Sequence, residues 1–168
     1  MTLTDAAGNV TTSASAFRFN VDPTAVTSGT TPVGEPIALT PGISGDEMMA
    51  LADQDVNLTL LATNLGTQYK YKSLDLSVAG ANRALIDADS VAQLTQINAI
   101  ETTGANAERF QLLVKGTAED TVDLQGAAGT TGWTQQTNPV LLSGVQYQVW
   151  NNDTNKVTVY IDKTVHVI

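Results

Sequence analysis

The sequence predicts a mainly β protein, either a β-sandwich or a short β-solenoid-like module, with one or two short helices. Three observations predict this class. Apolar and polar residues alternate in several short runs, which is the period of a half-buried strand. Glycine, asparagine and aspartate clusters separate these runs and are typical of turns. Charged residues make up only 15% of the chain, against about 25% in soluble domains.

Composition divides the 168-residue chain into three parts. Residues 1–22 predict a terminal hairpin, because turn residues precede the alternation of Phe17, Phe19 and Val21. Residues 23–42 contain four of the five prolines and little periodicity, which predicts a linker. Residues 43–168 are expected to form the β-rich module.

One or two short helices are expected in this module. Ser44 and Glu47 form a capping-box pattern, so a helix is predicted over residues 45–53. Apolar residues recur every three positions over residues 90–100, which predicts either a second helix or a tight corner.

The remaining periodic segments are predicted to be strands. The clearest pair is Val145–Val149 and Val157–Ile161, which alternate on either side of an Asn- and Asp-rich turn and predict a β-hairpin. A terminal strand through Val165 and Val167 follows. Further strands are predicted over residues 56–60, 69–78, 110–114 and 121–124.

The composition also excludes classes of function. The chain has no cysteine and one histidine, so disulfide frameworks, thiol catalysis and multi-histidine metal sites are excluded. A net charge of −9 predicts that nucleic acid is not a partner. We expect no membrane insertion, because no apolar run approaches roughly 18 residues, and the first residues do not read as a signal peptide.

The sequence shows none of the common catalytic fingerprints, neither a nucleophile elbow nor a phosphate-binding loop. The single histidine, His166, lies between Val165 and Val167, and such alternation predicts that its side chain faces outward from a strand. We therefore expect a protein that is not an enzyme and has no catalytic residue.

Two parts of the chain resemble modules of large bacterial adhesins. Residues 3–10 (LTDAAGNV) and 19–24 (FNVDPT) resemble the end of a bacterial Ig-like repeat. Residues 50–168 resemble a module of repetitive adhesins that are exported by type I secretion. The matching stretches are INAIETTG at 97–104, DTVDL at 120–124, GW at 132–133, GVQY at 144–147, VYID at 159–162 and VHV at 165–167.

This resemblance implies an extracellular, non-catalytic module at the bacterial cell surface. Its role would be structural or presenting, in surface attachment and biofilm formation, with neighbouring adhesin domains as partners. The alternative is a domain of such an adhesin that binds glycan or peptide. Residues expected to serve that alternative are Trp133, Trp150, Tyr160, Asn151 and Asn155, whose rings and amides suit sugar stacking and hydrogen bonding. A spacer would instead bury both tryptophans in its core.

Acidic turns raise the question of Ca²⁺, which prefers carboxylate, amide and carbonyl oxygens. The candidate ligands are Asp22, Asp120, Asp123 and Asp153. Asp22 directly precedes the predicted linker over residues 23–42. A calcium ion shared there between two domains would stiffen the junction. No EF-hand or nonapeptide calcium pattern is present. The competing interpretation is that these carboxylates are solvated turn residues, and no other cofactor is expected.

Overall fold

The computed structural model describes residues 2–4, 10–12, 40–41, 47–50, 53, 55–65, 70–78, 80–125 and 132–168. The chain falls into two compact units, Met1–Val33 and Gly34–Ile168. In the first unit, strands β1 (Thr2–Thr4) and β2 (Val10–Thr12) pair antiparallel. The alternation predicted at Phe17–Val21 lies outside the described residues.

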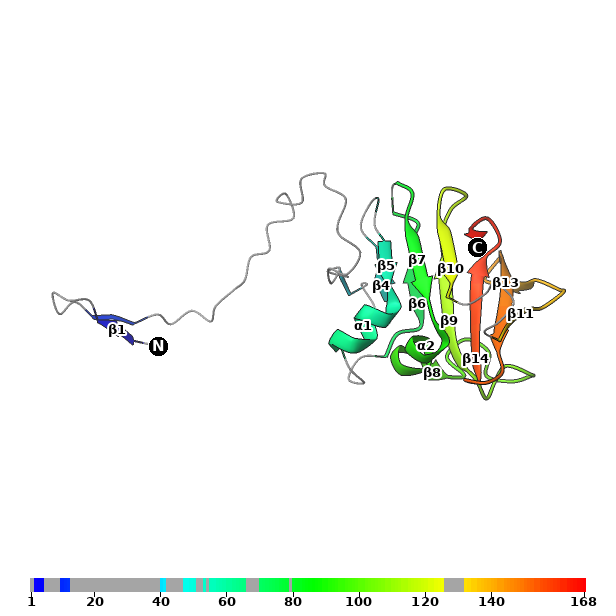
Figure 1. Ribbon diagram of the computed structural model, residues 1–168, viewed down its shortest axis with the longest axis horizontal. Coiled ribbons are helices and arrows are strands. Elements are labelled where there is room, and N and C mark those ends of the chain that lie inside the picture. Colours follow the sequence, from blue (N-terminus) through cyan, green and yellow to red (C-terminus); the bar gives the residue numbers. More distant parts are fainter. Residues whose placement is uncertain are drawn as a thin grey trace. The chain divides into compact units, whose positions relative to one another are not determined.

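The second unit repeats one path: a strand of a first sheet, a corner, and a strand of a second sheet (Figure 1). We call each pass a coil. The strands of the four coils are β4 (Glu47–Met49) and β5 (Asp55–Asn57), β6 (Ser73–Asp75) and β7 (Arg83–Ile86), β9 (Phe110–Lys115) and β10 (Thr121–Leu124), and β14 (Val157–Asp162) and β15 (His166–Val167). Equivalent strands of successive coils pair in parallel.

The described residues therefore form a mainly β fold with two short helices, as the sequence predicts. Parallel stacking of coils is the path of a short solenoid, whereas hairpin-linked sandwiches pair their strands antiparallel. The two sheets nevertheless enclose one common core, so the layers of a sandwich are present as well.

Helices close the first two coils. Helix α1 (Leu58–Leu65) follows β5, and α2 (Ala88–Leu94) follows β7. Asp87 caps α2 by accepting the Ser90 N–H at 2.8 Å, and it also accepts the hydroxyl of Thr59 in α1 at 2.6 Å. Burial alone would raise the pKa of the Asp87 carboxyl, but the hydrogen bonds from Ser90 and Thr59 outweigh it and lower that pKa.

Two predictions in this region were wrong. Residues 47–49 of the predicted 45–53 helix form β4, because parallel pairing with β6 sends Met48 into the core. Leu58 and Leu60 lie in a helix rather than a strand, since Leu58, Leu61 and Ala62 also fit the i, i+3, i+4 stripe of a helix. The second predicted helix is confirmed as α2, although it begins and ends earlier.

The predicted C-terminal hairpin is confirmed: β13 (Val145–Asn152) pairs antiparallel with β14. On its other edge, β13 pairs with β11 (Trp133–Gln135) and β12 (Val140–Leu142). A two-residue turn joins β12 to β13, and its residues Ser143 and Gly144 have φ values of 49° and 86°, as a type I′ turn requires. The short strands β3 (Thr40–Pro41) and β8 (Gln96–Ile97) pair with β4 and β9.

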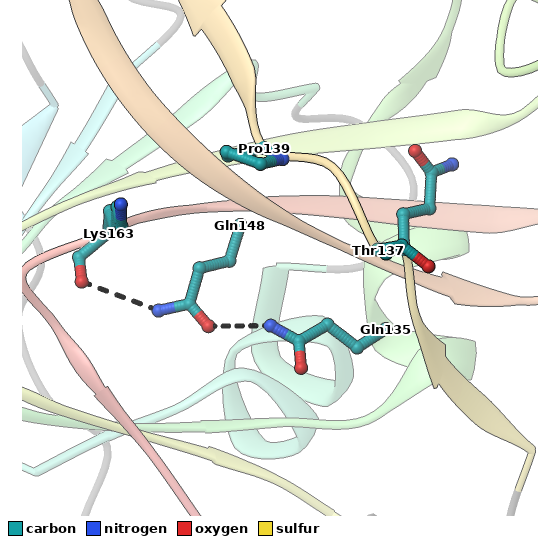
Figure 2. Close-up of a pocket in the computed structure, with 6 residues that line it drawn as sticks. Gln135, Thr137, Pro139, Gln148 and Lys163 are labelled. Atoms are coloured by element: carbon teal, nitrogen blue, oxygen red, sulfur yellow. Dashed lines mark hydrogen bonds between the residues drawn. The ribbon is translucent and has the colours of Figure 1, made fainter.

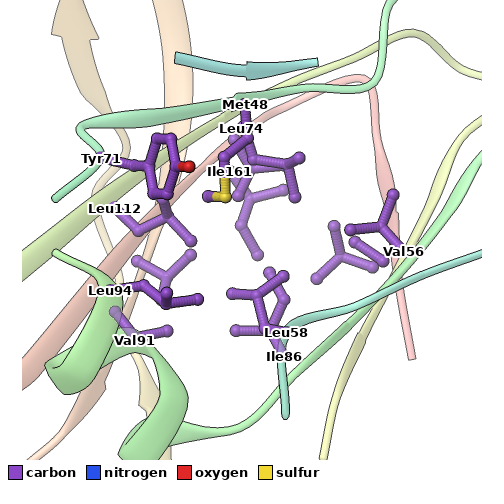
Figure 3. Packing of buried hydrophobic residues seen from close by; sticks show 14 of the residues in the cluster. Met48, Val56, Leu58, Tyr71, Leu74, Ile86, Val91, Leu94, Leu112 and Ile161 are labelled. Carbon is purple, nitrogen blue, oxygen red and sulfur yellow. The ribbon is translucent and has the colours of Figure 1, made fainter. Parts of the chain in front are cut away.

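The core lies between the two sheets and the helices, and each coil contributes to it (Figure 3). Met48, Leu74, Val114 and Ile161 occupy neighbouring positions across β4, β6, β9 and β14, the strands that the four coils contribute to the first sheet. All four side chains are buried. The opposite face of this sheet has a smaller buried cluster of Tyr147, Val149 and Tyr160, with Ile100, Leu113, Val140 and Leu142 packed around it.

Polar side chains join the corners of successive coils. The buried Asp120 carboxylate lies in the corner of the third coil, between β9 and β10. It accepts the backbone N–H of Asn82, which lies in the corner of the second coil between β6 and β7, at 2.9 Å. It also accepts the N–H of Thr117 at 2.7 Å. Gly116 is required at this corner, because a Cβ there would lie 2.6 Å from Cγ2 of Val165 in the fourth corner.

Candidate functional site

An open groove of about 440 Å³ lies beside the last coil, where β11 and β13 extend the first sheet (Figure 2). The chain from β11 to β12 forms one side, and the turn after β14 contributes a lysine. Its lining residues are Gln135, Gln136, Thr137, Pro139, Gln148 and Lys163. This described part of the lining contains three amides, one amine and no carboxylate.

Hydrogen bonds order the amides of the groove. Gln135 Nε2 donates to Gln148 Oε1 at 2.9 Å, and Gln148 Nε2 donates to the carbonyl oxygen of Lys163 at 3.5 Å (Figure 2). Gln136 Nε2 donates to Asn106 Oδ1 at 3.4 Å. An amide offers two N–H donors and two acceptor lone pairs, so this network leaves groups for a polar, uncharged ligand.

Sequence reasoning did not single out the groove residues. Of the groove residues, only Gln148 belongs to a pattern in the sequence: Gln146 and Gln148 alternate with the apolar residues of β13. That pattern is equally typical of any solvated strand face. The groove arises from β11, β13 and the turn at Lys163, which are brought together by sheet pairing rather than by spacing.

The structure does not bring the five residues predicted for ligand binding onto one surface. Trp133 and Trp150 are half-buried and pack against the core, and Trp150 Nε1 is buried without a hydrogen-bond partner among the described residues. Tyr160 is fully buried on the opposite face of the sheet. Asn151 Oδ1 accepts the Thr158 hydroxyl at 2.7 Å, and the Asn155 amide donates to Asp89.

The predicted metal ligands are likewise apart. The Asp120 carboxylate joins two corners, Asp123 pairs with Arg83 at 2.6 Å, and the exposed Asp153 pairs with Arg109 at 2.9 Å. Asp22 lies outside the described residues. Within the part of the chain that the structure describes, no three acidic, histidine or cysteine side chains converge.

Because each of these described carboxylates already has a protein partner, we predict that calcium does not stabilise the second unit. The melting temperature, followed by tryptophan fluorescence, should be the same in millimolar calcium and in chelator, since both tryptophans belong to this unit. A rise of several degrees with calcium would contradict this prediction and would return attention to the acidic turns.

Tyr160 predicts a stability change at alkaline pH. Burial, reinforced by the nearby Glu101 carboxylate, raises the pKa of the Tyr160 hydroxyl above its usual value. The unfolded state therefore loses this proton first, and the free energy of unfolding should fall as the pH rises above about 10. Burial also raises the pKa of Tyr147, so Tyr160→Phe should make this fall shallower without abolishing it. The free energy of unfolding of both proteins is measured by urea titration at a series of pH values. If it falls equally steeply with pH in the wild type and in Tyr160→Phe, the prediction is contradicted.

Among the described residues, neither helix is long and apolar enough to cross a membrane. Comparisons with protein-family models, with curated proteins and with solved structures find no match for this chain.

Proposed function

We propose that this chain is a non-catalytic structural module of a large bacterial surface adhesin, acting outside the cell. It would space or present the binding parts of the adhesin during surface attachment and biofilm formation. The resemblance of residues 3–10, 19–24 and 50–168 to adhesin modules motivates the proposal. Neighbouring adhesin domains would be its partners.

One observation carries the proposal: buried polar side chains of the described region serve to hold coils and loops together. Asn82 Nδ2 donates to the carbonyl oxygens of Leu76 and Val78 at 2.8 and 3.1 Å. Gln111 Oε1 accepts two backbone N–H groups, and its Nε2 donates to two carbonyls, which fastens the loop before β9. Groups engaged in this way stabilise a scaffold and are not free for substrate.

The half-buried tryptophans also favour the spacer over an aromatic glycan platform, because stacking would need an exposed ring. Binding of glycan or peptide stays a second candidate function. The specific observation in its favour is the amide-lined groove, not the residues that the sequence suggested.

The proposal can be tested by displaying the chain on a laboratory bacterium between a surface anchor and a lectin of known specificity. Cells should be retained under flow on the lectin's sugar better than cells with the lectin fused directly to the anchor. Leu112→Ala leaves a cavity in the core and should reduce the added retention of the cells. Leu141→Ala, a control at an exposed position, should leave the added retention unchanged. Equal retention with and without the chain would contradict a spacing role.

A further inference from the structure

We infer that the groove between β11, β13 and Lys163 is a binding site for a neutral, hydroxyl-rich oligosaccharide. This inference rests on the second candidate function, the binding of glycan or peptide, and names the ligand class and the residues that would bind it; the spacing role does not depend on it. The site consists of Gln135, Gln148 and Lys163, with Thr137 and Pro139 at its side.

The chemistry of the lining favours a sugar. Sugar hydroxyls both donate and accept hydrogen bonds, and so do the amides of Gln135 and Gln148. The hydrogen bond between these amides fixes their orientation before a ligand arrives, which lowers the entropic cost of binding. The described lining has one cationic group, Lys163, but the net charge of −9 on the whole chain repels an anionic ligand, whereas an uncharged sugar is not repelled.

The lining also supplies a small apolar contact. Gln135 lies directly opposite Trp150, and Gln148 precedes Trp150 by two residues on β13, so both glutamines lie on one face of the sheet. Trp150 itself packs against the core and is not part of the lining. Thr137 and Pro139 do line the groove, and the threonine methyl group and the proline ring offer C–H surface to a sugar ring beside the amides.

An extended peptide fits this edge less well. Peptides commonly bind sheets by adding a strand along a continuous free edge. Here the edge consists of β11 and β12, each of three residues, and residues 136–139 interrupt it. Pro139 has no N–H to donate, and prolines and breaks of this kind protect sheet edges from strand addition. Recognition by side-chain amides is the mode that the geometry leaves open.

The test is a titration of the isotope-labelled chain, followed by the NMR signals of side-chain amides. The probes are maltohexaose, cellohexaose and mannohexaose, with oligogalacturonate as the anionic comparator and an alanine hexapeptide as the peptide comparator. At least one neutral oligosaccharide should shift the Gln135 and Gln148 amides saturably. Gln148→Ala and, separately, Gln135→Ala should weaken its affinity about tenfold, the loss of one or two hydrogen bonds.

Gln96→Ala is the matched control, because Gln96 is an exposed glutamine on the distant strand β8. It should leave the affinity unchanged. Unchanged backbone amide spectra of the three variants show that each is folded, and Gln135, being exposed, is the safer of the two groove substitutions. The inference is overturned if no neutral oligosaccharide binds saturably, if the groove variants bind as the wild type does, or if oligogalacturonate or the peptide binds more tightly.

Discussion

Replacing Asp120 by alanine is expected to lower the free energy of unfolding by about 3 kcal/mol, because it removes the acceptor for three donors at a buried corner. These donors are the N–H of Asn82 at 2.9 Å and the N–H and hydroxyl of Thr117 at 2.7 and 3.0 Å. The Asn82 N–H belongs to the preceding coil. Loss of its hydrogen bond to Asp120 therefore weakens the stacking of the two coils as well as the turn that contains Asp120.

The matched control is Asp153→Ala, which removes a carboxylate that pairs with Arg109 from an exposed position. Exposed ion pairs contribute about 1 kcal/mol or less. Urea unfolding of both variants measures the difference. If the free energy of unfolding of Asp120→Ala lies within about 0.5 kcal/mol of that of the control, Asp120 does not join the coils as described.

Replacing Leu112 by alanine should cost about 3 kcal/mol, within the usual range of about 2 to 5 for a fully buried leucine. Leu112 lies on β9, a central strand of the first sheet, opposite Val159 of the next coil. Its side chain fills the common core between the sheets, so truncation leaves a cavity that neighbouring coils cannot close without moving their strands.

Leu141→Ala is the control for this substitution, because Leu141 is mostly exposed on the edge strand β12. Its removal should change the free energy of unfolding by no more than about 0.5 kcal/mol. The same urea titration applies. Similar losses in the two variants would mean that the core does not lie between the sheets at β9.

Local patterns predicted the fold where apolar residues recur at every second position along a strand. The alternation in β9 and in the β13–β14 hairpin could be recognised from the sequence alone, because mostly polar residues stand between these apolar residues. The first coil could not be recognised. Its strands β4 and β5 have three residues each, and a run that short fits a helix or a strand equally well. Parallel pairing with later coils decides between them.

The candidate site was less predictable than the fold. Aromatic residues and acidic turns drew attention to Trp150 and Asp120, because rings and carboxylates are common in binding sites. In the folded chain Trp150 packs on the core and Asp120 binds backbone N–H groups. The amides of Gln135 and Gln148 meet only after β11 pairs with β13, and no spacing in the sequence announces that pairing.

Single-molecule stretching tests the proposed spacing role most directly, since a spacer must stay folded when the attached cell is pulled. The chain should be held at its two ends. The account predicts that the Gly34–Ile168 unit unfolds in one step that releases roughly 400 to 450 Å of chain, because the stacked coils share one core. Extension without a force peak, or in several small steps, would contradict the claim that this unit is a coherent structural module.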